Sequence, residues 1–344
     1  MNFTVCKSIE EIDRKKFETF AGNHPHYSVF QSLDIYDFFD LTDNFEPVAL
    51  TIENEKAEVV ASLVGVIIRE YGGFMSTFSS RTVVYGGPLI AVSHPDHRSI
   101  LDLVLKSLIR LVRNESIFIQ FRNFFDFRDD LRIFKRNGFD FQERLNFLVS
   151  ASDEKSTLSG ISKSKLRQIR SSLRAGAEIV EPQTLDEVRE FYDILHMLYK
   201  EKVRKPLPSW SFFATFYHQS KKGKVGKYLL IRYNGSIVGG VLCPITEGRV
   251  IYEWYVCGLD HDITQVHPSV LATWAPIDYA LRNNISTFDF MGVGKPDKPY
   301  GVREFKSKFG GELVNFGRFG RINNSFYYTI AEIGYNILSI FKKI

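Results

Sequence analysis

The residues best suited to holding an anion lie in one stretch near the C-terminal end of the chain. Between Phe288 and Phe316 the sequence reads FDFMGVGKPDKPYGVREFKSKFGGELVNF. We expect a strand, then a loop rich in glycine, proline and lysine, and then a second strand that forms around Phe305-Lys306 and a Gly310-Gly311 turn. A buried strand that ends in glycines and cations presents N–H and ammonium groups, which can hold an anionic ligand or a developing oxyanion. The alternative is a surface hairpin loop whose charges are solvated.

A carboxylate that could accept a proton lies on another predicted strand, Ile251–Cys257 (IYEWYVC). Alternation along this strand places Tyr252 and Trp254 on one face, and Glu253 and Tyr255 on the other. A carboxylate among apolar neighbours tends to have a raised pKa, which suits it to deprotonating an amine. The alternative is a glutamate that lies at the sheet surface or pairs with an arginine.

Two helices offer further sites for an anion. The helix that begins after His267-Pro268 is expected to leave free N–H groups near Ser269 and Val270, unless Pro268 is only a favourable first residue. A basic helix, SKSKLRQIRSSLRA, is predicted over residues 162–175. Its cations are Lys163, Lys165, Arg167, Arg170 and Arg174. They form either a solvated face or a cationic ridge for a polyanionic donor, such as tRNA or a nucleotide-bearing thioester.

Several functional classes find no support in the sequence. The eight histidines form no HExxH motif, the three cysteines have no metal-type spacing, and no nucleophile elbow, P-loop or dinucleotide-binding fingerprint appears. We therefore expect no metal and no bound cofactor. The net charge of +4 is too small to imply nucleic acid by itself, and we expect no DNA partner. Cysteine usage, the absence of a signal peptide and the absence of a long apolar run predict a cytoplasmic protein.

The chain contains an internal repeat. Residues 94–121 align with residues 266–290, and residues 134–149 align with residues 305–319, each pair giving similar helix and strand patterns. With 344 residues and 30 phenylalanines, this pattern predicts two α/β units with mixed sheets. We place them at residues 1–151 and 152–344. The second includes the basic connecting helix 162–175 and an amphipathic C-terminal helix 325–344, for which a role at a membrane interface stays open.

The two copies differ at the loop MGVGKPDKPYGVRE, which only the second contains. We therefore expect the second unit to carry the chemistry and the first to act as scaffold and acceptor platform.

Together these motifs resemble the FemAB-type transferases, which are relatives of the GNAT acyltransferases built from two GNAT-like units. The resemblance covers nearly the whole chain. It rests on residues 269–316 with their GVREFKSKFGG core, and on FQSLDIYDFF, YGGPLI and SKSKLRQIRSSLRAGAEIVE. It implies an α/β fold in which two tandem GNAT-like units pack around a shared cleft.

The resemblance also implies roles for particular residues. Lys306 matches a lysine that lies near the donor and stabilises developing charge, and Phe305 matches its aromatic neighbour. Tyr252 and Tyr255 lie where the family has site tyrosines, and with Glu253 they complete the catalytic candidates. Asp289 and Gly292 match the D-F-x-G positions. The other binding candidates are Gly294, Arg303, Lys308, Ser269, Arg167, Arg170, Gln31 and Tyr85.

The implied activity is acyl transfer to an amine of a cell-envelope precursor, either a small molecule or a lipid-linked one. The donor is a co-substrate, either aminoacyl-tRNA or acyl-CoA. The second unit lacks a long helical hairpin that some tRNA-using members carry, so the donor stays open. The alternatives are an acyl-CoA-dependent N- or O-acyltransferase acting on a surface sugar, and a non-catalytic GNAT-like binding protein. Peripheral contact with the inner face of the membrane is also left open.

Overall fold

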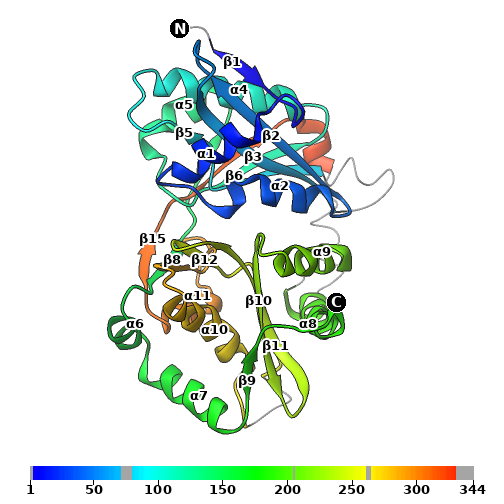
Figure 1. Cartoon of the computed structure of the whole chain (residues 1–344), viewed down its shortest axis with the longest axis vertical. Helices are drawn as coiled ribbons and strands as arrows, with labels where there is room; N and C mark the ends of the chain where they lie inside the picture. The colour runs from blue at the N-terminus through cyan, green and yellow to red at the C-terminus, as the bar shows by residue number, and fades with distance from the viewer. Residues whose placement is uncertain (1–2, 71–79, 204–205, 261–264, 331–344) are drawn as a thin grey trace. The chain divides into compact units, whose positions relative to one another are not determined.

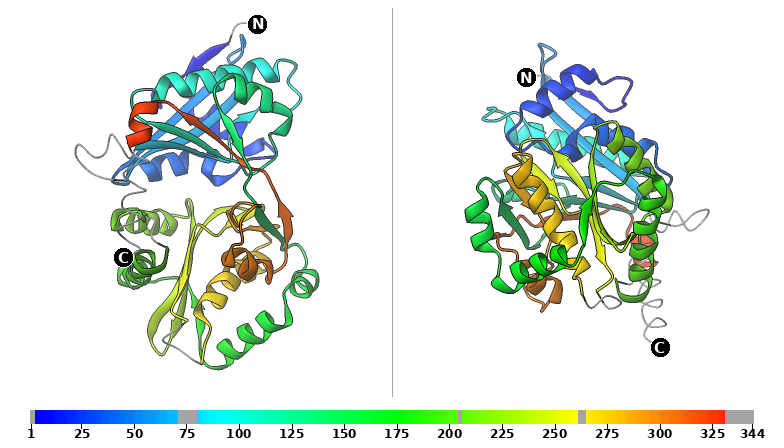
Figure 2. Two further views of the ribbon diagram at one scale, coloured as in Figure 1. Left: turned by 180° about the vertical axis from the view of Figure 1, so that it is seen from behind. Right: turned by 60° about the horizontal axis from the view of Figure 1, so that its bottom comes forward.

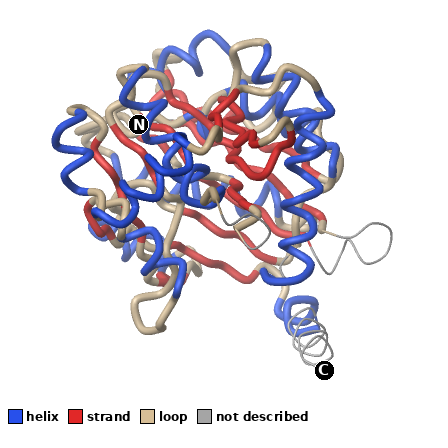
Figure 3. Tube along the Cα trace, turned by 90° about the horizontal axis from the view of Figure 1, so that it is seen from below, coloured by secondary structure: helices blue, strands red, loops and turns tan. Residues whose placement is uncertain are grey.

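A computed structural model describes residues 3–70, 80–203, 206–260 and 265–330 (Figure 1). Contacts divide the chain into two compact units, unit 1 (residues 1–143 and 316–344) and unit 2 (residues 144–315). Each unit contains one eight-stranded sheet with both parallel and antiparallel pairs, and the predicted α/β class is confirmed. Helices flank the strands of both sheets (Figure 3). Among the described residues, no helix is long and apolar enough to cross a bilayer.

The sheet of unit 1 has the order β1-β2-β3-β4-β6-β16-β7, and β5 pairs with β3. Its strands are β1 (Thr4–Cys6), β2 (Phe45–Glu53), β3 (Val59–Arg69), β4 (Ser80–Tyr85), β5 (Leu89–Ile90), β6 (Phe118–Arg122), β7 (Asp140–Gln142) and β16 (Arg318–Ile322). Its helices are α1 (Arg14–Asn23), η1 (Val29–Gln31), α2 (Leu33–Asp40), α4 (His97–Val112), η3 (Arg128–Asp130) and α5 (Leu131–Arg136). Helices α1 and α2 cover one face of this sheet and α4 covers the other (Figures 1 and 2).

The sheet of unit 2 has the order β15-β8-β14-β12-β11-β10-β9, and β13 pairs with β11. Its strands are β8 (Asn146–Ser150), β9 (Glu178–Val180), β10 (Gly226–Tyr233), β11 (Ser236–Thr246), β12 (Val250–Tyr252), β13 (Tyr255–Gly258), β14 (Thr287–Asp289) and β15 (Glu312–Val314). Its helices are α6 (Glu154–Gly160), α7 (Lys163–Arg174), α8 (Leu185–Leu198), η4 (Tyr199–Val203), α9 (Trp210–Lys221), α10 (Pro268–Arg282) and α11 (Gly301–Ser307). Helices α7 and α10 lie on one side of the sheet, and α8 and α9 lie on the other (Figure 1).

The topology of unit 2 repeats that of unit 1, which confirms the duplication predicted from the sequence. In unit 1, α4 connects β4 to its parallel neighbour β6, and in unit 2, α10 connects β12 to its parallel neighbour β14. The amphipathic pattern of α4 buries Ile100, Val104 and Leu108 against the sheet, in the hydrophobic core of unit 1.

The two units exchange a strand. Strand β8 follows the first copy in the sequence but lies between β14 and β15 in the sheet of unit 2. Strand β16 follows the second copy but lies between β6 and β7 in unit 1. There the Phe319 ring stacks on Phe134 with centroids 3.8 Å apart. The units therefore differ from the predicted division at residues 151/152, because each sheet is completed by a strand from the other side of that boundary. The helix predicted over 325–344 begins within unit 1, and its part beyond residue 330 lies outside the described residues.

The segment around Phe305-Lys306 is a helix, α11, so the strand predicted there is wrong. The second strand of the stretch begins only after Gly310-Gly311, at β15. Both glycines have positive φ, and a Cβ on Gly311 would lie 2.8 Å from the Leu148 carbonyl oxygen. Glycine at this position therefore lets β15 pair closely with β8.

Candidate active site in unit 2

The parallel strands β12 and β14 separate at Glu253. The pairing of β12 with β14 ends at Tyr252 and Asp289, where the Glu253 N–H donates to the Asp289 carbonyl at 2.9 Å. The next N–H, that of Trp254, turns to the Leu242 carbonyl, and β13 continues along β11. Glu253 therefore lies between β12 and β13 in the chain, at the point where β12 and β14 stop pairing.

A buried ion pair lies at this divergence. The Lys306 Nζ is 2.7 Å from the Glu253 Oε1, and it also donates to the Phe290 carbonyl oxygen at 2.9 Å. The Glu253 side chain is 0% exposed and that of Lys306 is 11% exposed. The structure thus brings together two of the predicted catalytic residues, Lys306 and Glu253, whose pairing the sequence did not predict.

A second buried carboxyl, that of Asp289, lies close enough to affect the pair. Burial raises the pKa of Glu253, the Lys306 ammonium opposes this, and the Asp289 charge adds to it. Burial also raises the pKa of Asp289, and hydrogen bonds from the Asn146 side chain and the Met291 N–H oppose this. With two carboxyls and one ammonium, the cluster favours retention of a proton.

Asn146 fixes the start of the loop that follows β14. Its Nδ2 donates to the Asp289 Oδ1 at 2.7 Å, and its Oδ1 accepts from the Gly292 N–H at 2.7 Å. The Asp289 Oδ1 also accepts from the Met291 N–H at 2.6 Å. Asp289 and Gly292 are therefore used to shape the loop. Sequence reasoning missed Asn146, because it lies on the exchanged strand β8 and no local pattern pairs β8 with β14.

Arg303 also holds this loop. Its Nε donates to the Val293 carbonyl at 3.0 Å, and its Nη2 bonds the Lys295 carbonyl. The Gly294 carbonyl accepts from the Leu145 N–H at 2.9 Å, and Gly294 has a positive φ. These two predicted binding residues therefore make contacts within unit 2 that order the loop.

The basic helix α7 is divided between a buried and an exposed side. Lys165 is 8% exposed, and its Nζ lies 4.4 Å from the centroid of the Phe305 ring. Burial lowers the pKa of Lys165, and the nearby Lys308 ammonium lowers it further. Arg167 and Arg170 are exposed, as is Lys308. The sequence grouped Lys165 with the other cations of the helix. In the structure Lys165 differs from Arg167 and Arg170, because it is buried and forms a cation–π contact with Phe305.

The N-terminal end of α10 is already occupied by side-chain and backbone acceptors. The Ser269 N–H donates to the Asp260 Oδ1 at 2.9 Å, and the Val270 N–H donates to the His267 carbonyl at 3.1 Å. The expectation that these N–H groups are free is therefore wrong, because Asp260 caps the helix from a loop nine residues earlier.

The two candidate tyrosines differ in their surroundings. Tyr252 ends β12 and is 2% exposed. Tyr255 begins β13, is half-buried, and makes edge-on contacts with the Phe212 and Phe213 rings at centroid distances of 5.7 and 5.4 Å. Tyr252 therefore precedes, and Tyr255 follows, the point at which the strands diverge at Glu253.

Gln31 and Tyr85 belong to unit 1, whereas the cluster around Glu253 belongs to unit 2. The Gln31 Nε2 donates to the Val64 and Tyr85 carbonyls at 2.8 and 2.7 Å, and its Oε1 accepts from the Val64 N–H at 2.9 Å. A Cβ on Gly87 would lie 2.6 Å from the Gln31 side chain. The buried amide thus fills the break between β4 and β5, which corresponds in the repeat to the break between β12 and β13.

The two cysteines of unit 2 and possible metal ligands are alternatives to this cluster. Among the described residues, no three His, Cys, Asp or Glu side chains gather as metal ligands would. Cys243 and Cys257 are free and buried, and burial raises the pKa of both thiols well above the usual range. Their thiolate fractions are therefore small, and neither is suited to act as a nucleophile.

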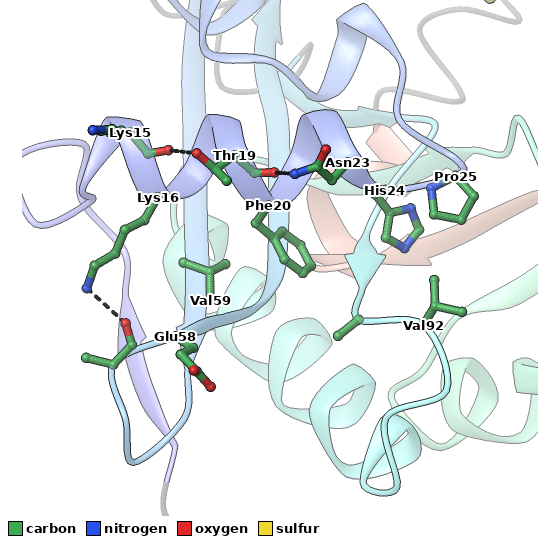
Figure 4. Close-up of a pocket in the computed structure, with 12 residues that line it drawn as sticks. Lys15, Lys16, Thr19, Phe20, Asn23, His24, Pro25, Glu58, Val59 and Val92 are labelled. Carbon is green, nitrogen blue, oxygen red and sulfur yellow. Dashed lines mark hydrogen bonds between the residues drawn. The ribbon is translucent and has the colours of Figure 1, made fainter.

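An apolar pocket of about 610 Å³ lies in unit 1 between α1 and the turn from β2 to β3 (Figure 4). The Lys16 Nζ donates to the Ala57 carbonyl at 2.9 Å, the Thr19 hydroxyl to the Lys15 carbonyl, and the Asn23 side chain to the Thr19 carbonyl. None of the sequence-predicted site residues is among those that line it. The cluster around Glu253 is therefore the stronger candidate.

In comparisons with known proteins, a family model matches residues that lie within unit 2. Residues 163–307 match the family model described as an acetyltransferase (GNAT) domain. No curated protein matches the chain. Among solved structures, FemX superposes with a TM-score of 0.70 at 13% identity, covering 94% of this chain and 99% of FemX.

Two further solved structures cover similar shares of the chain. A tandem GNAT protein from the clavulanic acid biosynthesis pathway gives a TM-score of 0.60 at 10% identity, over 94% of this chain and 99% of the other. L-PGS from Bacillus licheniformis gives 0.55 at 12% identity, over 93% and 96%. The similarity extends over both units.

Proposed function

The chain has the tandem GNAT fold and carries a GNAT acetyltransferase domain over residues 163–307, and on this basis we propose that it is an acyltransferase. The reaction would move an acyl or aminoacyl group from an activated donor to an amine. We assign the acceptor to the cell-envelope precursors, small or lipid-linked. FemX and L-PGS, which share the fold, support the aminoacyl alternative, and the acetyltransferase description of the matched domain supports an acyl thioester donor.

The observation that carries the proposal is the Glu253–Lys306 pair at the divergence of β12 and β14. The corresponding positions of unit 1 are Gly86, which follows β4, and Lys135, which is exposed. The pair therefore occurs in the unit that matches the acetyltransferase model and lacks a counterpart in the other unit. Duplicated scaffold with one diverged site is the pattern expected when only one copy performs the chemistry.

In the proposed mechanism, the acceptor amine attacks the carbonyl of the donor directly. Glu253, whose pKa is raised by burial, takes the proton that the amine loses. An ammonium has three N–H donors, and Lys306 uses two of them for Glu253 and the Phe290 carbonyl. The third is left for the oxyanion of the tetrahedral intermediate. Collapse of this intermediate breaks the bond to the leaving sulfur or oxygen, which takes the proton held by Glu253 and departs as the thiol or the tRNA hydroxyl.

The test is acyl transfer by the purified chain with a panel of donors, comparing acyl-CoA with aminoacyl-tRNA. We expect turnover with one donor class and a loss of roughly 10²–10⁴-fold in Glu253→Gln. Asp278→Asn is the matched control, because Asp278 on α10 is a half-buried carboxyl whose pKa is also raised by burial. Full turnover in Glu253→Gln would rule out the assigned role of this residue.

The donor class can be separated by binding measurements. A tRNA donor predicts affinity that falls steeply as salt concentration rises, since each neutralised phosphate releases counterions. An acyl-CoA donor predicts a shallow salt dependence.

One observation favours a second candidate function, that of a non-catalytic GNAT-like binding protein. The Lys306 ammonium is 11% exposed and already has two acceptors, as a purely structural lysine would. This alternative predicts saturable donor binding with no turnover for any acceptor amine, and no change in donor affinity in Glu253→Gln.

A further inference from the structure

A second cavity of unit 1 carries an excess of arginines. It has a volume of about 820 Å³ and lies between the first turns of α4 and the segment formed by η3 and α5. Its charged lining consists of Arg98, Arg128, Arg132, Arg136, Asp102 and Asp129. We call it the arginine cavity. Its volume falls in the range of roughly 300–1,000 Å³ that small-molecule sites occupy.

The partly buried acid of this cavity, Asp102, is fully used by neighbouring groups. The Asp102 carboxylate pairs with Lys106 at 2.7 Å and with Arg136 at 2.9 Å, and it accepts from the Asn137 side chain at 2.8 Å. Burial acts to raise the pKa of Asp102, but these contacts outweigh it and lower the pKa to about 2. Asp102 therefore stays ionised and committed to Arg136 and Lys106.

Two acids of the η3 region, Asp126 and Asp130, likewise have partners of their own. Asp126 pairs with Arg128, and the Asp129 charge also acts on Arg128. Asp130 pairs with His97 at 3.0 Å. None of these contacts involves Arg98 or Arg132.

Two guanidinium groups thus remain without a partner. Over the described ranges, neither Arg98 nor Arg132 makes an ion pair or a side-chain hydrogen bond, and both line the cavity. Arg98 lies in the first turn of α4 and Arg132 in the first turn of α5. Each of these two helices therefore contributes one guanidinium group whose N–H donors are unused.

We infer that the arginine cavity binds a small phosphorylated molecule, with its phosphate groups between Arg98 and Arg132. A guanidinium presents paired N–H donors that match phosphate oxygens, and two guanidinium groups without an ion-pair partner match the charge of about −1.5 to −2 on a phosphomonoester. The apolar Leu131 and Ile133 side chains of the lining can contact the rest of the ligand.

A nucleic acid fits this surface less well. Tight nucleic-acid binding commonly neutralises about 6–10 phosphates along an extended surface, whereas two free arginines line a single local concavity here. The inferred site lies in unit 1, outside residues 163–307, and does not depend on the proposed acyl transfer.

The test is calorimetric titration of the full chain at low ionic strength, first with inorganic pyrophosphate and then with ADP. The test variant is Arg98→Ala/Arg132→Ala. The control Lys56→Ala/Arg110→Ala also removes two exposed cations from unit 1, but neither lines the cavity. A third variant, Arg98→Lys/Arg132→Lys, keeps the charge and removes the paired donors.

We expect saturable binding of pyrophosphate, weakened at least about tenfold in the alanine double variant and within twofold in the control. The lysine variant should fall between them, because charge remains while bidentate contact is lost. Absence of saturable binding to the unmodified chain would overturn the inference, as would equal loss in the control. Binding of tRNA that the alanine variant abolishes, without binding of pyrophosphate, would overturn it in favour of a nucleic-acid surface.

Discussion

The Lys306 ammonium and the Glu253 carboxylate stabilise each other in a place that water barely reaches. Taking two charges out of water costs several kcal/mol per ion, which the mutual attraction offsets only while both partners remain. The pair is therefore expected to contribute strongly to the local structure when probed one residue at a time, and much less when both residues are replaced. Comparing the stability of the single and double variants therefore measures the structural contribution of the ion pair separately from its proposed catalytic role.

Lys306→Met should lower the free energy of unfolding by about 3–5 kcal/mol, because it leaves the Glu253 carboxyl buried without a counter-charge. Adding Glu253→Gln should recover most of that loss, since an amide carries no charge. Urea unfolding of the two single variants and the double variant measures the coupling. Additive losses would show that the two side chains do not interact as the 2.7 Å contact indicates.

Glu253 and Lys306 could be identified from the sequence, whereas Asn146 and Asp260 could not, because the contacts of the latter two form only on folding. Strand alternation placed Glu253 on the face opposite Tyr252 and Trp254 and left open whether that face is buried, and the structure shows that Glu253 is buried. Asn146 and Asp260 could not be found in this way, because their partners, Asp289 and Ser269, become neighbours only in the folded unit. The resemblance identified Lys306, but no local pattern shows which carboxylate it meets.

At the scale of elements, α4 and α5 are joined by one carboxylate. Asp102 on α4 contacts Arg136, the last residue of α5, and Asn137, which follows it. The folded-state pKa of Asp102, about 2, lies below its ordinary value, so the contact stabilises the fold above about pH 4. That contribution is lost as pH falls through about 2.

Asp102→Asn should therefore lower the free energy of unfolding by about 1 kcal/mol at neutral pH, because Lys106 and Arg136 lose their counter-charge. The difference between variant and unmodified chain should shrink as pH falls from about 4 to about 2, where Asp102 itself becomes protonated. Urea unfolding at several pH values measures it. A difference that stays constant over this range would contradict the assigned ionisation.

Helix α11 shows where element prediction from the sequence failed. The apolar spacing of Val302, Phe305 and Phe309 fits a helix, but the glycines and prolines around it favoured a turn followed by a strand. In the structure, α11 is short, and tertiary contacts such as those of Lys306 hold it in place. Short elements of this kind depend on packing more than on propensity.

At the scale of the whole molecule, the exchange of β8 and β16 decides where the units begin and end. The internal repeat predicted two units correctly, because helices and adjacent strands carry local patterns. The repeat could not predict the exchange of strands, because the apolar pattern of β8 fits a strand of either unit. The pairing of β8 with β14 and β15 is what places β8 in unit 2.

A fragment of residues 144–315 should therefore fold, because it contains all eight strands of the unit 2 sheet. A fragment of residues 152–344 lacks β8, so that β14 and β15 lose their common neighbour, and it should fail to form a protected sheet. Hydrogen exchange of the two fragments, measured by mass spectrometry, tests this. Equal protection in both would contradict the exchange.

The proposed mechanism depends on proton transfer to Glu253, and the pH dependence of acyl transfer tests this step most directly. The measurement is kcat/KM against pH with the donor class that supports turnover, for the unmodified chain and for Glu253→Gln. Because a base must be deprotonated and burial raises the pKa of Glu253, the rate should rise with pH through an ionisation above the ordinary carboxyl range. Glu253→Gln should be slower and should lack this rise. The same rise at full rate in Glu253→Gln would contradict the account.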